Sequence, residues 1–298
     1  MSAEAPADDD RPVWRGMTRA ALAAQYNPQI AVPDPARYGR ENREASARAR
    51  AELPGVLDIP YGPGPRNRLD VFPARNRALA RDGLAPVLVF VHGGGWRTLD
   101  KSVYSFIAPA WSAAGVTTVL PSYGLLPEVP LVRMIDEARE AIRWVAEHAR
   151  EHGGDPERIV LAGMSAGAQL SGMALAHPPT ARHVKAAALA SSVFDLEPHR
   201  WHGRHDDMGL DDALVAAASP FHNLPCDPAL PMSVSIGAEE TPEMIRQARE
   251  YHAKLVARGQ PARLIVEPGR HHLNMGRVFA EPATETFRAI AQAIARLA

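Results

Sequence analysis

The sequence has 298 residues, of which 46% are hydrophobic and 22% are charged, with a formal net charge of -1. These values are typical of a soluble globular protein with a sizeable core, and the near-zero charge without basic runs argues against nucleic acid or a membrane surface as partner. We therefore expect a small-molecule ligand, and the one cysteine, Cys226, together with an acidic start at 1–10, predicts a cytoplasmic protein.

The chain begins with an acidic, alanine-rich stretch, which predicts a disordered tail over residues 1–12 and one domain over 13–298. The segment 18–53 is rich in Ala, Arg and Glu and is interrupted by prolines at 28, 33 and 35, which predicts two helices. Alternating runs at 56–59 and 69–72, separated by a Gly-Pro-Gly-Pro turn, predict an antiparallel hairpin at a sheet edge.

From residue 86 onward, apolar strands alternate with helical patterns, which predicts a doubly wound, mostly parallel α/β sheet with helices on both faces. Ligands of such sheets bind at the carboxyl ends of the strands. The long, weakly periodic stretch at 194–223 is predicted to be a lid insertion. The strands are predicted at 86–91, 117–120, 160–164, 184–190, 232–236 and 262–266, and the helices at 130–149, from 166, at 242–257 and from 275.

One of these strands runs into Gly163-Met164-Ser165-Ala166-Gly167 and then directly into a helix of small residues. This strand–turn–helix context is what a nucleophile elbow requires, with Ser165 held in a tight turn above the sheet. The two glycines remove side chains that would collide with the neighbouring strand and helix. Ser165 is therefore the predicted nucleophile.

A serine nucleophile needs a histidine base and an acid that orients the base, and in this fold the order along the chain is Ser, acid, His. The loop after the strand at 262–266 holds His271 and His272, which spacing alone does not separate. For the acid, the sequence offers Glu240 and Glu239, with Asp195 as a further alternative.

Three glycines at 93–95 follow the buried strand at 86–91. Without side chains, their N–H groups can approach a developing oxyanion closely. We assign the predicted oxyanion hole to the N–H groups of Gly94, Gly95 and Ala166.

These features resemble the α/β-hydrolase superfamily and, within it, the kynurenine formamidase-like (arylformamidase-like) branch with its carboxylesterase neighbours. The resemblance implies an α/β-hydrolase fold with Ser165 as nucleophile, Glu240 as acid and His272 as base. Three departures bear on the substrate: Glu240 stands where aspartate is usual, Leu273 stands where an aromatic residue is frequent, and the lid run 199–207 has no match. The residues that carry the resemblance are those at 25–28, 92–96, 100–102, 122–127, 163–167, 194–198, 219–220, 240–247 and 269–273.

The predicted activity is that of a serine hydrolase that cleaves a small ester or an N-formyl or aryl amide, and the resemblance makes N-formylkynurenine the first substrate to try. Alternatives are a broad carboxylesterase, an acyltransferase or cyclase with the same triad, and, least favoured, a non-catalytic ligand receptor.

Trp96, Tyr123 and Trp201 are predicted to contact substrate, since aromatic side chains frequently line such pockets. No cofactor or metal is predicted, because the histidine- and aspartate-rich run 199–207 lacks a recognisable ligand spacing and is expected to be solvated and mobile. A homodimer is left open.

Overall fold

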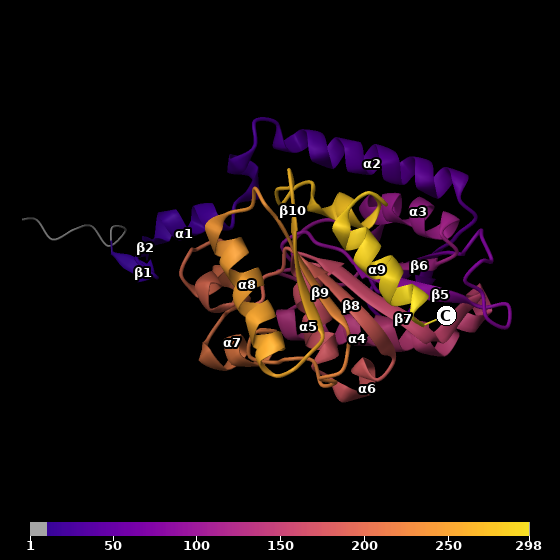
Figure 1. The fold of residues 1–298 in the computed structure, drawn as a ribbon. Helices are drawn as coiled ribbons and strands as arrows, with labels where there is room; N and C mark the ends of the chain where they lie inside the picture. The colour runs from indigo at the N-terminus through magenta and orange to yellow at the C-terminus, as the bar shows by residue number, and fades with distance from the viewer. Residues whose placement is uncertain (1–10, 298) are drawn as a thin grey trace, which may run out of the picture.

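The protein, described by a computed structural model over residues 11–297, is organised around an eight-stranded sheet with the order β10-β9-β8-β7-β5-β6-β4-β3 (Figure 1). Neighbouring strands from β10 to β6 are parallel, whereas β4 pairs antiparallel with β6, and β3 with β4. The strands are β3 (Val56–Pro60), β4 (Arg68–Phe72), β5 (Ala85–Val91), β6 (Thr117–Pro121), β7 (Gly154–Met164), β8 (Val184–Ala190), β9 (Met232–Gly237) and β10 (Ala262–Glu267). The predicted parallel sheet and edge hairpin are both confirmed.

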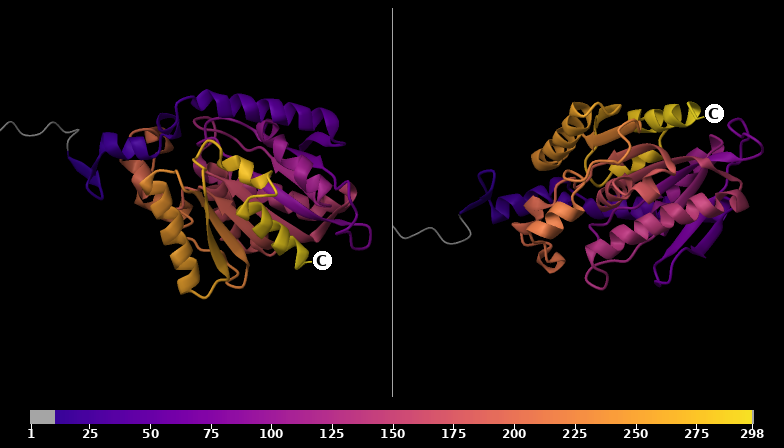
Figure 2. Two further views of the ribbon diagram at one scale, coloured as in Figure 1. Left: turned by 45° about the horizontal axis from the view of Figure 1, so that its top comes forward. Right: turned by 90° about the horizontal axis from the view of Figure 1, so that it is seen from below.

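Helices cover both faces of the sheet (Figure 2) because its central strands are apolar on both sides. In β5, Val87, Val89 and Val91 pack with one set of helices, whereas Leu88 and Phe90 pack with the other. The first set is α4 (Leu131–His148), α5 (Ala166–Leu175) and α8 (Pro242–Ala257); the second is η3 (Lys101–Ile107), α3 (Ala108–Ala113) and α9 (Glu285–Ala295). Short helices η4 (Ala149–His152) and α6 (Pro178–Ala181) lie in connections.

The N-terminal segment forms a two-stranded hairpin and two α-helices. The two helices, separated by a proline-containing connection, were predicted from the sequence. Its elements are β1 (Pro12–Trp14), β2 (Met17–Thr18), α1 (Arg19–Gln25), η2 (Pro28–Ala31) and α2 (Pro35–Glu52), the last lying across the top of Figure 1. Contacts from Gln25 and Tyr26 tie the end of α1 to the start of α8: Thr241 donates to the Gln25 carbonyl at 2.8 Å, and the Tyr26 hydroxyl donates to Glu243 at 3.1 Å. Of the predicted tail, residues 1–10 lie outside the described residues, and Pro12 already belongs to β1.

Two stretches differ in detail from the sequence-based expectation. The helix predicted from Met275 onward is instead a 3-10 turn, η7 (Met275–Phe279), followed by a break and then α9. The break has a local cause, since Pro282 cannot continue a helix and Thr284 caps α9 by accepting from the Phe287 N–H at 3.3 Å. The stretch predicted as a lid holds η5 (Glu197–Arg200), η6 (Asp206–Met208) and α7 (Asp212–Ala218).

No helix within residues 11–297 is long and apolar enough to cross a membrane.

Candidate active site

Ser165 occupies the sharp turn between β7 and α5, with φ 54° and ψ -124°. Such a conformation is strained for a residue with a side chain and is found at functional turns. A Cβ on Gly163 would lie 2.7 Å from the Gly167 carbonyl oxygen, and one on Gly167 would overlap the carbonyl oxygens of Val91 and His92. Only glycine therefore fits at these two positions, as the elbow pattern predicted.

A hydrogen-bonded chain runs from this serine through His272 to Glu240. The Ser165 Oγ lies 3.0 Å from His272 Nε2, and His272 Nδ1 lies 2.8 Å from Glu240 Oε2. The other carboxylate oxygen of Glu240 accepts a hydrogen bond from the Ser191 hydroxyl and one from the Gly237 N–H at 3.4 Å. With its side chain 1% exposed, Glu240 is a buried and fully engaged carboxylate.

The other candidates for base and acid, His271, Glu239 and Asp195, do not belong to this hydrogen-bonded chain. His271 packs edge-on against Tyr38, with ring centroids 4.7 Å apart, and burial lowers its pKa. Glu239 is exposed. The Asp195 carboxylate accepts from the Glu197 N–H at 3.0 Å, and its burial raises its pKa. The structure brings neither alternative acid into hydrogen bonding with His272.

The glycine loop after β5 turns back on itself beside Ser165. Gly94 has φ +133° and Gly95 φ +58°, and the Gly94 carbonyl accepts from the Thr98 N–H at 3.0 Å. Within residues 11–297, the N–H groups of Gly94 and Gly95 donate to no other protein group, and Ala166 is the first residue of α5, where N–H groups lack a helical partner. All three predicted oxyanion-hole donors are thus free to bind a ligand atom.

His92 packs against the glycine loop. Its Nδ1 lies 2.7 Å from the Gly93 carbonyl oxygen, and its ring stacks on Tyr123 with centroids 4.4 Å apart. Complete burial lowers the pKa of His92 to about 4, so the ring is neutral at pH 7. The Tyr123 hydroxyl donates to the His92 carbonyl at 2.8 Å, and burial raises its pKa. Tyr123, predicted to contact substrate, is instead a buried prop that does not line the cavity.

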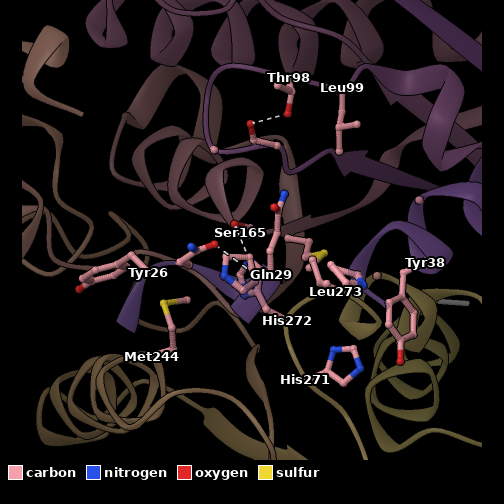
Figure 3. A pocket seen from close by; sticks show the side chains of 18 of the residues that line it. Tyr26, Gln29, Tyr38, Thr98, Leu99, Ser165, Met244, His271, His272 and Leu273 are labelled. Atoms are coloured by element: carbon pink, nitrogen blue, oxygen red, sulfur yellow. Dashed lines mark hydrogen bonds between the residues drawn. The ribbon is translucent and has the colours of Figure 1, made fainter. Parts of the chain in front are cut away.

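Ser165 and His272 open into a cavity of about 600 Å³ (Figure 3). In the figure, Tyr26 and Met244 flank them on one side and Tyr38 and Leu273 on the other. Part of this wall comes from the N-terminal segment, which the sequence did not link to the site. Among the lining residues are Gln25, Tyr26, Gln29, Tyr38, Asn42, Arg43, Trp96, Leu99, Met244 and Leu273.

Of the aromatic residues predicted to contact substrate, only Trp96 lines the cavity. Its indole N–H donates to Gln169 at 3.0 Å, which fixes the ring in the wall. Trp201 is turned to local partners instead: its indole N–H donates to Glu197 at 3.1 Å, and Arg200 lies 4.9 Å from its ring centroid.

Three arginines line the cavity, and they differ in pairing. Arg97 forms an ion pair with Asp207, whereas Arg43 and Arg204 form none with any residue in 11–297. Arg43 and Arg204 are exposed and so remain available to a substrate carboxylate.

Three histidines of the segment 199–207 are packed together, which corrects the expectation of a solvated run. His199 is 2% exposed and His202 is 3% exposed. Burial lowers the pKa of His199, and it lowers the pKa of His202 and of His205 to about 4. The cluster could not be predicted from the spacing of the histidines, because short irregular turns rather than one regular helix or strand bring them together.

The chain is similar in sequence and in structure to several known proteins. A family model for the alpha/beta hydrolase fold matches residues 88–275. Kynurenine formamidase of Danio rerio is 25% identical over 264 residues, covering 83% of this chain and 86% of the relative, and esterase LipQ of Mycobacterium tuberculosis is 31% identical over 261 residues, covering 80% and 60%. The crystal structure of a candidate thioesterase from Silicibacter sp. has a TM-score of 0.78 at 25% identity, covering 92% of this chain and 98% of that one.

Proposed function

The chain belongs to the alpha/beta hydrolase fold family, and from that premise we propose that Ser165, His272 and Glu240 form the catalytic triad of a serine hydrolase. The observation that carries the proposal is the position of His272, whose two ring nitrogens lie 3.0 Å from Ser165 Oγ and 2.8 Å from Glu240 Oε2. Glu240 accepts from Nδ1–H and so leaves the Nε2 lone pair directed at the serine hydroxyl.

In the first half of the reaction, His272 Nε2 removes the proton of Ser165 as its oxygen attacks the substrate carbonyl. The carbonyl oxygen becomes an oxyanion, which the N–H groups of Gly94, Gly95 and Ala166 bind. His272 then gives the same proton to the leaving alcohol or amine, and the bond from the carbonyl carbon to that group breaks. An acyl-enzyme on Ser165 remains.

In the second half, His272 removes a proton from water, whose oxygen attacks the acyl carbonyl. The second tetrahedral oxyanion is bound by the same three N–H groups, and collapse returns the proton to Ser165 and releases the acid. The buried carboxylate of Glu240 stabilises the imidazolium that forms in both halves. If an acceptor other than water attacked the acyl-enzyme, the protein would be an acyltransferase, and analysis of the products distinguishes transfer from hydrolysis.

For the substrate, we propose an N-formyl aryl amide that carries an amino-acid end, with N-formylkynurenine as the first example. Two observations support it: the relatives named kynurenine formamidase align along most of the chain, and the cavity presents Arg43 and Arg204, which form no ion pair within residues 11–297. A guanidinium can hold the substrate carboxylate while the aromatic ring lies among Tyr26, Tyr38 and Met244.

A carboxylesterase is the second candidate, and the apolar part of the wall favours it. Leu99, Met244 and Leu273 line the cavity and would suit the chain of an uncharged ester. Relatives named esterase and carboxylesterase support this class.

Steady-state hydrolysis of N-formylkynurenine beside a short-chain p-nitrophenyl ester distinguishes the candidates, with Ser165→Ala as the control. The formamidase proposal predicts a much higher kcat/KM for the formamide, and Arg43→Gln or Arg204→Gln should raise its KM without changing that of the ester. If only the ester is hydrolysed, the substrate proposal is wrong while the triad stands. If Ser165→Ala retains full activity, the triad itself is wrong.

We also propose a cytoplasmic location. Fractionation of cells that express the full chain tests it, and light scattering on the purified protein tests the homodimer that the sequence left open.

A further inference from the structure

Three histidines of the segment 199–205 lie close enough together to hold one metal ion. The candidate ligand atoms of His199, His202 and His205 all lie within 4.8 Å of one another. His199 Nδ1, His202 Nε2 and His205 Nδ1 are buried and have no hydrogen-bond partner within residues 11–297. None of the three therefore satisfies another.

Three such nitrogens in one segment need an explanation, because a buried polar atom without a hydrogen-bond partner destabilises the folded protein. The surrounding rings hold the cluster in place. Tyr26 packs against His199 and His202 with ring centroids 4.2 and 5.1 Å apart, and Trp96 packs edge-on against His199 and His205 at 5.6 and 5.5 Å. Both aromatic residues are themselves fixed by hydrogen bonds, Tyr26 to Glu243 and Trp96 to Gln169.

We propose that His199, His202 and His205 form a binding site for a divalent transition metal, with Zn²⁺ as the first ion to test. Three imidazole nitrogens suit Zn²⁺, Cu²⁺, Ni²⁺ or Co²⁺, whereas Mg²⁺ and Ca²⁺ require oxygen ligands. The site is separate from the triad, and its existence does not depend on the proposed reaction.

The geometry is close to what zinc requires. With Zn–N bonds of about 2.0–2.1 Å, two ligands of a tetrahedral site lie roughly 3.4 Å apart. The present separations are at most 4.8 Å, so metal binding requires the nitrogens to approach one another by at most about 1.4 Å.

His202 requires one further adjustment. Its Nδ1 accepts a hydrogen bond from the Arg204 N–H at 3.1 Å, which places the ring proton on Nε2. Coordination through Nε2 moves this proton to Nδ1 and turns the Arg204 amide away. The intervening Gly203 is exposed and has φ +76°, so the two-residue turn has room for the change. Metal binding should thus switch the tautomer of His202.

The site would lie in the wall of the cavity, since His199 and His205 line it. Three protein ligands leave a fourth tetrahedral position for water or for an anionic group of a bound molecule. The metal would also hold together a segment that has little regular structure of its own.

The test is metal binding by the purified full chain after incubation with Zn²⁺ and dialysis into metal-free buffer. We expect about one equivalent of retained zinc, none of it replaceable by Mg²⁺, and with Co²⁺ the visible absorption of a tetrahedral ion. His202→Gln and His205→Asn keep similar size and polarity but remove a ligand, so both should lose the retained ion. Zinc retained equally by wild type and both variants, or by none of them, would overturn the proposal.

Matched controls exclude zinc bound elsewhere. His222→Ala removes an exposed histidine of the same region, and His152→Ala removes a half-buried histidine that lies 5.9 Å from the Trp144 ring between centroids; neither variant should lose the ion. Should a cluster variant fail to fold, ¹⁵N spectra of wild-type histidines still decide. A proton shift from Nε2 to Nδ1 of His202 on adding zinc supports the site, and unchanged ring shifts refute it.

Discussion

Replacing Glu240 by glutamine removes one negative charge from the hydrogen-bonded chain and little else. The glutamate side chain is 1% exposed and lies 2.8 Å from His272 Nδ1, so the new amide remains in the same buried position. An amide N–H2 group directed at His272 would favour the wrong ring tautomer, and the imidazolium formed during the reaction would lose its counter-ion.

The size of the effect follows from the separation of the two charges. At a distance of roughly 4 Å between charge centres, the attraction is about 4 kcal/mol at an effective dielectric constant of ~20. Because about 1.4 kcal/mol corresponds to tenfold in rate, Glu240→Gln should lower kcat by roughly a thousandfold.

The assay is kcat for a p-nitrophenyl ester under saturation, with circular dichroism and urea unfolding to show that the variant is folded. Glu239→Gln is the matched control, since this neighbour is exposed and its loss should change kcat by about twofold at most. A folded Glu240→Gln enzyme that loses less than about tenfold would refute the role of Glu240.

Three other perturbations test the surroundings of the triad. In Gly167→Ala the new methyl group would overlap the carbonyl oxygens of Val91 and His92, so the free energy of unfolding in a urea titration should fall by about 3 kcal/mol or more. The control Gly259→Ala has a positive φ of +83° but nothing within 4 Å of the new methyl group, so it should lower the same quantity by only about 1–2 kcal/mol. Ser191→Ala removes a hydrogen bond to the Glu240 carboxylate and should reduce kcat about tenfold; an unchanged kcat would show that Gly237 suffices. Folding lowers the pKa of His92 from about 6.5 to about 4, so between these pH values the imidazole is protonated in the unfolded chain and neutral in the folded one. The free energy of unfolding should therefore fall by about 2 kcal/mol between pH 7 and pH 5 because of His92. A His92→Asn protein with the same pH dependence would contradict this.

The sheet and the elbow could be predicted because their signals are local. Continuous apolar runs such as 86–91 require burial on both faces, and the turn at Ser165 requires Gly163 and Gly167 for steric reasons. The break before α9 could have been predicted as well, since Pro282 and Thr284 are a recognised stop and start.

The selection between neighbouring candidates required the fold. Glu239 and Glu240 are adjacent, and only the start of α8 determines which carboxylate is turned inward to meet His272. In the same way, Tyr123 and Trp201 are aromatic residues of the kind that lines pockets, but their polar atoms donate hydrogen bonds to His92 and Glu197 outside the cavity wall.

Long-range packing explains what the sequence did not reveal about the cavity. Tyr26 and Tyr38 lie more than a hundred residues from Ser165 along the chain, and no periodic pattern links them to it. The histidine cluster depends on the same packing, because Tyr26 from the N-terminal segment and Trp96 from the glycine loop close around it.

Covalent labelling by a fluorophosphonate, followed by peptide mapping, tests whether Ser165 is the nucleophile. We expect one adduct per chain, on Ser165, that is absent from folded Ser165→Ala and slow to form in Glu240→Gln. A folded, hydrolytically active wild-type protein that carries no adduct on Ser165 would contradict it.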